Sequence, residues 1–187
     1  DNTLKVELAI KDIEIIFFIQ KELKTNSPIK FATHIYNDKP IKSVYLRICS
    51  ESLIDSLLSL GILPNKSGRE SLPNVPKQFL PDYFRGLFDG DGCYYLGKTW
   101  SNKSGKYFFD RKINLCMMNK EYLNNIQVLL GYGTINKCSH SLAYTLNIRS
   151  IANIMKFIEY VYYDGFEFSL KRKYDLAQQL MENCRVS

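Results

Sequence analysis

Apolar and polar residues alternate along several short stretches of this chain, as they do in strands that bury one face and expose the other. The alternation predicts inward-facing side chains at Leu4, Val6, Leu8, Ile10, Leu46, Ile48, Ile113, Leu115, Met117, Leu146 and Ile148. It predicts outward-facing side chains at Lys5, Glu7, Tyr45, Arg47, Lys112, Asn114, Thr145 and Asn147. The outward faces are therefore polar and partly basic, which is also true of an ordinary solvated face of an antiparallel sheet.

Segments with helical spacing of apolar residues separate these strands. The expected helices are Ile13–Lys24, Glu51–Leu60, Pro81–Gly90, Glu121–Leu130, Ile151–Tyr162 and Leu170–Asn183. The residues placed to cap the amino ends of four of them are Asp12, Ser50, Asn119 and Ser150. Each of these side chains can accept a hydrogen bond from a backbone N–H that the helix leaves unpaired.

The order of strands and helices occurs twice, which predicts an α+β fold of two pseudo-repeated units. Each unit is expected to be an antiparallel sheet covered by helices on one face. We expect the first unit at residues 1–68, a linker at 69–79 and the second unit at 80–187, with its first helix at 81–90. Lys5 and Lys112 are expected at equivalent places, and the first copy has no counterpart of the helix at 81–90.

Composition narrows the class of protein. The chain has 187 residues, of which 45% are hydrophobic and 24% charged, as in ordinary globular proteins. Its formal net charge of +6 favours an anionic partner, although a mildly basic globular protein fits this charge equally well. Five cysteines without a CxxC pair argue against a disulfide framework and a zinc site, and they favour an intracellular, reducing compartment. The sequence has no apolar run of about 18 residues, so we expect no membrane span.

The segment Leu80–Gly92 carries the most specific chemistry. Pro81 suits the first turn of a helix, where its missing N–H is not needed. Gly86 and Gly90 lie four residues apart on one helix face, which they leave bare for the close approach of another backbone. Asp91 then follows at the carboxyl end, where the helix dipole disfavours a carboxylate. An acid in that position is expected to hold a cation.

Phe84 to Gly92 resemble the nine-residue LAGLIDADG motif of homing endonucleases, with Gly86, Leu87, Asp89, Asp91 and Gly92 identical. The resemblance implies two saddle-shaped sheets over DNA and a pair of packed motif helices. It also implies a site-specific double-strand DNA endonuclease that hydrolyses phosphodiester bonds with a divalent metal and is encoded within an intron or intein. A second motif helix is therefore an expected partner, from an upstream segment or a separate chain.

The resemblance also implies roles for individual residues. Asp91 is the expected ligand of Mg²⁺, or of Mn²⁺ or Ca²⁺, unless it is only an acid of the Asp-Gly turn. Lys66 and Lys171 are the expected catalytic cations near the active-site water, with Lys173 as the alternative to Lys171 after a register error of two. Asp89 is expected to hydrogen-bond near the helix end rather than bind metal.

The remaining expected functions are DNA contact and packing. The candidate DNA-binding residues are Lys5, Tyr45, Arg47, Lys98, Lys106, Arg111, Lys112, Asn114 and Asn147, on strands and hairpins. Arg85 lies within the motif helix, so packing or an ion pair is its expected role.

Two other functions remain open at this point. A DNA- or RNA-binding module of the same fold, such as an RNA maturase or a transcription regulator, would have the fold without cleavage. An unrelated α+β interaction protein would require the motif and the repeat to coincide by chance. Affinity for nucleic acid at low salt separates this last alternative from the others.

Overall fold

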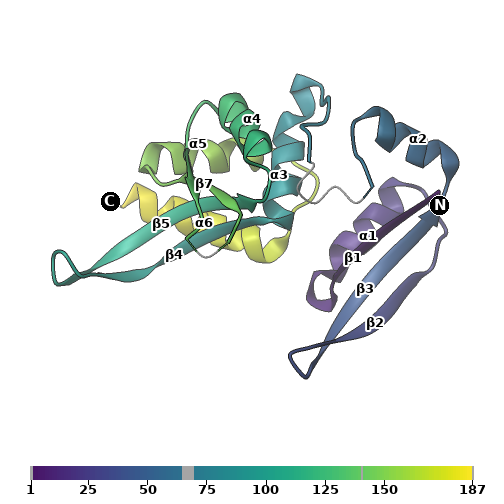
Figure 1. Ribbon diagram of the computed structural model, residues 1–187, viewed down its shortest axis with the longest axis horizontal. Helices are drawn as coiled ribbons and strands as arrows, with labels where there is room; N and C mark the ends of the chain where they lie inside the picture. Colours follow the sequence, from purple (N-terminus) through teal and green to yellow (C-terminus); the bar gives the residue numbers. More distant parts are fainter. Residues whose placement is uncertain (1, 65–69, 140, 187) are drawn as a thin grey trace. The chain divides into compact units, whose positions relative to one another are not determined.

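The computed structural model describes residues 2–64, 70–139 and 141–186, and the chain divides into two compact units, 1–60 and 61–187. Each unit combines one antiparallel sheet with helices (Figure 1), which confirms the predicted α+β class. None of the described helices is both long enough and apolar enough to cross a bilayer.

The first unit is a three-stranded sheet with two helices. Its elements are β1 (Thr3–Ala9), a 3-10 turn (Ile10–Asp12), α1 (Ile13–Glu22), β2 (Ile29–Tyr36), β3 (Lys39–Cys49) and α2 (Glu51–Ser59). The strand order is β1-β3-β2, with both pairs antiparallel. Its core is small: Ile16 of α1 packs on Val44, Leu46 and Ile48 of β3. The opposite face of the sheet stays open to solvent.

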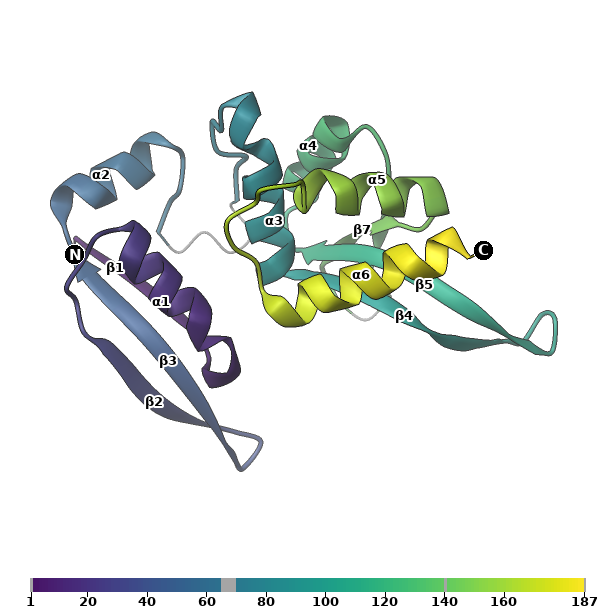
Figure 2. The same cartoon turned by 180° about the vertical axis from the view of Figure 1, so that it is seen from behind.

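The second unit is larger. Its elements are a 3-10 turn (Lys77–Phe79), α3 (Leu80–Gly90), β4 (Gly92–Ser101), β5 (Lys106–Met117), α4 (Lys120–Leu130), β6 (Thr134–Lys137), β7 (Tyr144–Ile148), α5 (Ile151–Val161) and α6 (Lys171–Arg185). The four strands are ordered β4-β5-β7-β6 and every neighbouring pair is antiparallel. The helices cover one face of this sheet (Figure 2).

Helix α3 is anchored in the core of the second unit by its aromatic side chains. Phe84 and Phe88 are fully buried, and the ring of Phe88 lies 4.5 Å from that of Phe157 on α5. Burying one such side chain contributes roughly 1.5–3 kcal/mol to folding. One stripe of α3 therefore fixes the helix to the sheet and to α5, while its other stripe is free for different contacts.

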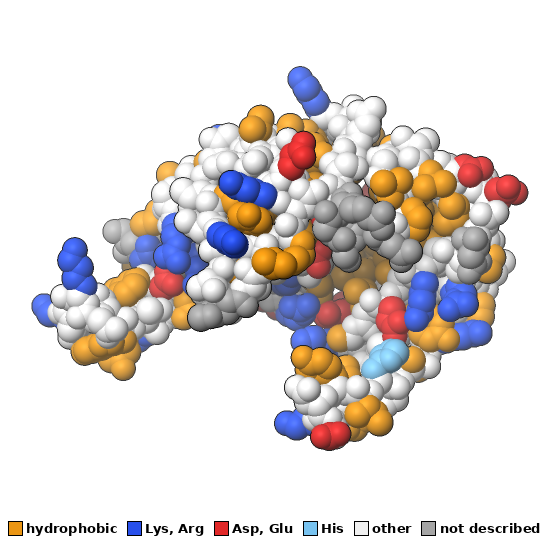
Figure 3. All heavy atoms as spheres, in the orientation of Figure 1, with side chains coloured by type: hydrophobic (Ala, Val, Ile, Leu, Met, Phe, Trp, Pro, Cys, Tyr) orange, Lys and Arg blue, Asp and Glu red, His pale blue; other side chains and the backbone are white. Residues whose placement is uncertain are grey.

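A long hairpin of β4 and β5 extends past the helices of the second unit (Figure 1). Near its tip the rings of Trp100 and Tyr107 meet edge to face at 5.0 Å. Lys98, Lys103 and Lys106 are exposed in this part of the ribbon, where Figure 3 shows basic side chains at the surface. The hairpin is therefore a basic and aromatic projection.

The alternation of residues predicted the sheet faces correctly, with one exception. Ile10 is 40% exposed because the chain leaves the strand at Ala9 and enters a 3-10 turn. Ser50, Asn119 and Ser150 cap their helices as predicted, since each side chain accepts a hydrogen bond from a backbone N–H of the first turn. Asp12 precedes α1 but makes no capping hydrogen bond.

The two sheets correspond strand by strand. The order β1-β3-β2 matches β5-β7-β6, because β3 and β7 each lead directly into a serine cap, Ser50 or Ser150, and then a helix. Within the residues that the structure describes, β4 and α3 have no counterparts in the first unit. The outer edge of β1 corresponds to the edge of β5 that pairs with β4.

Strand pairing also corrects one predicted equivalence. Arg47 and Asn147 lie three residues before the two serine caps, so they are equivalent positions. Lys5 pairs with Arg47, whereas Asn147 pairs with Asn114. The counterpart of Lys5 is therefore Asn114, and the expectation that Lys5 matches Lys112 was wrong by two residues.

Candidate active site

The carboxyl end of α3 turns tightly into β4. The backbone N–H of Asp91 donates to the carbonyl of Leu87 at 2.9 Å, which closes the last turn of the helix. A Cβ atom at Gly92 would lie 2.6 Å from the carbonyl oxygen of Phe88. Only glycine fits this close approach, so the glycine that ends the motif is a steric requirement of the turn.

A buried lysine binds this turn from α6. The Nζ atom of Lys173 donates to the carbonyls of Phe88 at 2.8 Å, Gly92 at 2.6 Å and Gly90 at 3.4 Å. These carbonyls lie at the helix end, where backbone acceptors lack partners and the dipole is negative. Burial and the neighbouring Arg172 lower the pKa of Lys173, while Asp89, Cys93 and Asp91 act in the opposite direction. Lys173 thus joins α6 to the turn that carries Asp91.

Lys171, the lysine favoured from the sequence, lies elsewhere. It is exposed, and its Nζ donates to both carboxylate oxygens of Asp175 at 2.9 and 2.7 Å. The alternative considered for a two-residue register error, Lys173, is the lysine that the structure brings to the motif. Lys66 lies outside the described residues. Catalytic roles for Lys171 and Lys66 therefore stay predictions.

The sequence did contain a signal for the position of Lys173. It shares a helical stripe with Ala177, Leu180 and Cys184, all buried residues of α6. A lysine on an otherwise apolar stripe must be paired when it is buried. Lys171 lies off this stripe.

Asp89 is the buried acid of the motif, with 5% of its surface exposed. One carboxylate oxygen accepts from the Tyr162 hydroxyl at 2.9 Å, and the other accepts from the backbone N–H of Leu170 at 2.8 Å. Burial raises the pKa of the Asp89 carboxyl. Its contacts agree with the hydrogen-bonding role expected from the sequence.

Arg85 is also structural in its contacts. Its guanidinium is buried and donates to the carbonyls of Phe168 and Val161 at 2.7 and 2.9 Å, and to Asp82. The packing and ion pair expected for it are both present. Two charged residues of the motif thus fasten α3 to the segment between α5 and α6.

Asp91 differs from Asp89 in its exposure and in its hydrogen bonding. It is exposed, and no described side chain hydrogen-bonds to its carboxylate. An exposed carboxylate beside open solvent suits a hard cation that keeps several water or phosphate oxygens. The described residues contain no group of three or more His, Cys, Asp or Glu side chains that could hold a metal ion. Asp91 therefore fits as one ligand of a shared site, not as part of a complete protein cage.

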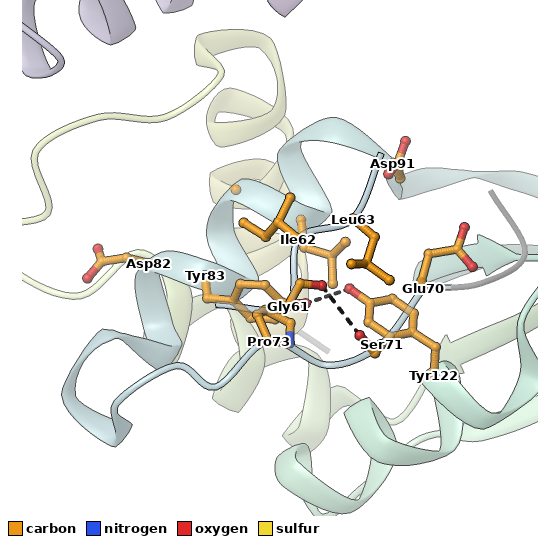
Figure 4. A pocket seen from close by; sticks show the side chains of 12 residues that line it. Gly61, Ile62, Leu63, Glu70, Ser71, Pro73, Asp82, Tyr83, Asp91 and Tyr122 are labelled. Atoms are coloured by element: carbon orange, nitrogen blue, oxygen red, sulfur yellow. Dashed lines mark hydrogen bonds between the residues drawn. The ribbon is translucent and has the colours of Figure 1, made fainter. Parts of the chain in front are cut away.

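The face of α3 that carries Gly86 and Gly90 is bare. A Cβ at either position would meet no described atom within 4 Å. Beside this face lies a pocket of about 390 Å³, lined by Tyr83, Leu87, Asp91 and Tyr122 among others (Figure 4). The hydroxyls of Tyr83 and Tyr122 form a 2.5 Å hydrogen bond, and the Asp91 carboxylate points away from this pair.

A model of the LAGLIDADG endonuclease family matches residues 84–180, which is more than half of the chain. The chain belongs to the LAGLIDADG endonuclease family. The match begins at Phe84, the first residue of the motif, and extends through most of α6. No curated protein matches the chain.

Solved LAGLIDADG structures share its fold. The meganuclease I-SmaMI bound to uncleavable DNA is 15% identical, with 98% of this chain and 78% of that chain covered and a TM-score of 0.68. The archaeal intron-encoded homing endonuclease I-Vdi141I, complexed with DNA, is 18% identical over 60% of this chain and 72% of that one, with a TM-score of 0.51. The homing endonuclease I-CvuI, in complex with target DNA in the presence of 2 mM Mg, is 18% identical. The match covers 58% of this chain and 67% of that chain, with a TM-score of 0.50.

The open sheet face of each LAGLIDADG unit holds most of the expected DNA contacts. In the first unit Lys5, Tyr45 and Arg47 share that face, and the Lys5 ammonium lies 4.7 Å from the centre of the Tyr45 ring. In the second unit Lys112 and Asn114 lie two residues apart on β5, so they share the open face, and Asn114 pairs with Asn147 on β7. Lys106 lies an even number of residues before Lys112 on β5, so it belongs to the same face, near the hairpin tip.

Two expected contacts lie on the other side of the second sheet. The Nε of Arg111 donates to Asn183 of α6 at 2.6 Å, so Arg111 lies on the helix-covered side, and its expected contact with DNA stays a prediction. The alternation that places Ile113 and Leu115 inward gives Arg111 the same side. Lys98 lies on the same side of the sheet as the buried Tyr94. It is exposed, because this part of the hairpin extends beyond the helices.

Sequence reasoning did not select several polar residues of the open faces. In the first unit these are Glu7, His34 and Ser43, which hydrogen-bond together. In the second unit they are Asp110 and Arg149. The alternation placed Glu7 outward, but an acid is not expected on a surface that binds a polyanion.

We predict that Lys173→Met destabilises the second unit and that Lys171→Met does not. The first change leaves three backbone carbonyls without their donor, at a cost of about 1–3 kcal/mol. The second removes only an exposed ion pair, worth less than about 1 kcal/mol. Urea unfolding followed by circular dichroism measures both. Equal midpoints for the two variants would contradict the assigned role of Lys173.

Proposed function

We propose that this chain acts in site-specific double-strand cleavage of DNA, as a metal-dependent homing endonuclease encoded within an intron or intein. The observation that carries the proposal is the exposed Asp91 carboxylate at the end of a motif helix whose other acid is buried and hydrogen-bonded. One acid maintains the fold, and the other is available for chemistry.

Asp91 would hold a divalent cation, with Mg²⁺ as the first choice and Mn²⁺ or Ca²⁺ as substitutes. Such a cation, when bound, activates water and stabilises charge on the leaving oxygen of a phosphodiester. Asp91 supplies a fixed carboxylate oxygen, because the turn on which it sits is held by Lys173 and by the close packing of Gly92 on Phe88. DNA phosphate and water would complete the coordination.

Lys173 has two roles in this proposal. Its hydrogen bonds to the carbonyls of Gly90 and Gly92 position the residue between them, which is Asp91. In this proposal a phosphate would approach close to Asp91, and the positive charge of Lys173 would stabilise the negative charge that develops on that phosphate. Lys171 and Lys66 remain candidates for a direct catalytic or DNA-backbone role.

DNA is the proposed partner of both open sheet faces. I-SmaMI and I-Vdi141I, which share the fold, have been solved bound to DNA. On this chain the proposed contacts to bases and phosphates are Lys5, Tyr45, Arg47, Lys98, Lys106, Lys112, Asn114 and Asn147. Residues on twisted antiparallel strands can follow the major groove, which is wide enough for a two-stranded ribbon.

A second motif helix is the other proposed partner. The bare face at Gly86 and Gly90 allows another helix backbone to approach closely. Such a helix, from an upstream segment or a separate chain, would bring a second acid to the site. This arrangement accounts for the single available carboxylate on α3.

The alternative function is binding without cleavage, by a maturase or a transcription regulator of the same fold. It is favoured because the described residues contain no group of three or more His, Cys, Asp or Glu side chains that could hold a metal ion. The two functions differ in what happens to bound DNA when Mg²⁺ is present.

We predict that Asp91→Asn abolishes cleavage and leaves DNA binding intact. Duplexes selected from a randomised library by the wild-type chain serve as substrates, with Mg²⁺ and a chain that carries a second motif helix present. Loss of the metal ligand should slow strand cleavage by about 100-fold or more, because several kcal/mol of charge stabilisation is removed. Binding should stay within about threefold. Wild-type protein that binds selected duplexes and never cuts them, even with a second motif helix supplied, would support the alternative.

We predict that Gly86→Leu lowers cleavage while the isolated chain remains as stable as before or more so. A Cβ added at Gly86 meets no described atom within 4 Å, and leucine is a better helix former than glycine by up to about 1 kcal/mol. Its side chain would keep a second helix from approaching. Cleavage assays and urea unfolding of the same preparation measure both effects. Unchanged cleavage would exclude helix pairing at this face.

A further inference from the structure

Both open sheet faces contain the same local arrangement around an acid. In the first unit Glu7 lies two residues from Lys5, whose ammonium covers the ring of Tyr45 at 4.7 Å. In the second unit Asp110 lies two residues from Lys112, whose ammonium covers a tyrosine ring at 4.8 Å. The register differs between the units, so the arrangement is not a simple copy.

Glu7 is the centre of a network that joins three strands. One carboxylate oxygen lies 2.6 Å from Nε2 of His34 on β2 and accepts from the Ser43 hydroxyl on β3 at 2.5 Å. The other accepts from Lys5 on β1 at 2.5 Å. Lys5 first, then Ser43 and His34, lower the pKa of Glu7 to about 2. Figure 3 shows acidic and basic side chains beside the histidine of this surface.

Asp110 holds two cations on the second face. Its side chain is only 11% exposed, with Lys112 Nζ at 3.5 Å and Arg149 Nη1 at 3.4 Å. Gly97 lies opposite Asp110 on β4, and a Cβ there would be 2.7 Å from the Tyr95 hydroxyl. Glycine at position 97 therefore leaves room for the Tyr95 ring that Lys112 covers.

An acid on a DNA-binding face repels phosphate, so its presence there needs a compensating effect. Lysine and arginine side chains lose rotamer entropy when they make a fixed contact. A lysine held by a carboxylate and an aromatic ring has lost much of that freedom before DNA arrives. It then presents its donors in one orientation, which favours one set of base edges over others.

We propose that Glu7 and Asp110 are positioning residues for sequence recognition, which hold Lys5, His34, Lys112 and Arg149 in fixed orientations across the two open faces. They lower affinity for DNA in general and raise discrimination among sequences. This inference rests on the proposed DNA-binding function. A purely structural ion pair would change stability and leave discrimination among sequences unchanged.

The test compares Glu7→Gln and Asp110→Asn with the wild type in two binding measurements. The probes are a random-sequence duplex and the duplexes that wild type selects from a randomised library, both with Ca²⁺ present. Affinity for the random duplex should rise about two- to fivefold. The slope of log K against log salt should steepen by roughly one, because each released cation can neutralise another phosphate. The ratio of selected to random affinity should fall about tenfold.

Matched controls separate positioning from net charge. Glu14→Gln on α1 and Asp164→Asn after α5 remove the same charge from exposed positions off the sheet faces, and they should leave the ratio unchanged. Asp110→Glu keeps the acid and should retain most of the discrimination. His34→Gln and Arg149→Gln alter exposed partners, so they test the same ratio if either acid variant unfolds.

The outcomes distinguish this inference from the proposed function. If wild type selects a sequence and the acid variants change the ratio no more than their controls do, the positioning role is overturned and DNA binding stands. If wild type binds duplex DNA without any sequence preference, both are overturned. A tenfold loss of discrimination with a steeper salt slope supports the inference.

Discussion

The contact on which the rest of the site depends is the hydrogen bonding of the buried Lys173 ammonium to the carbonyls of Phe88, Gly90 and Gly92. It neutralises the negative end of α3, joins α6 to the motif helix, and holds the turn from which Asp91 projects. On its other side, α3 is held by Phe84 and Phe88, which are buried in the hydrophobic core of the second unit. A carboxylate that would be unfavourable at a helix end is thereby kept in place and available.

The features that the sequence predicted well are those set by neighbours along the chain. Strand alternation placed Leu46 and Ile113 inward because side chains of a strand must alternate between faces. Capping by Ser50 and Asn119 followed from hydrogen bonds that span three residues. The motif resemblance predicted the family, which the family model confirms, while the roles of Asp91 and of the glycine face stay predictions.

The features that could not be predicted from the sequence depend on contacts between segments that are distant along the chain. The choice between Lys171 and Lys173 is set by how α6 rotates onto the sheet, and its buried stripe decides this. Arg111 pairs with Asn183, 72 residues away. The clusters around Glu7 and Asp110 need strands that come together only in the folded sheet. Charge alone suggested basic contacts, whereas the faces combine bases with acids that hold them.

The position of a divalent cation in the DNA-bound chain decides whether Asp91 is a metal ligand. Mn²⁺ broadens the NMR signals of nuclei close to it, so its site can be read from the amide spectrum without any cleavage assay. We expect substoichiometric Mn²⁺ to broaden first the amide signals of residues 90–93, and we expect Asp91→Asn to remove this effect. Broadening that is centred elsewhere, or that is the same in the variant, would contradict the account.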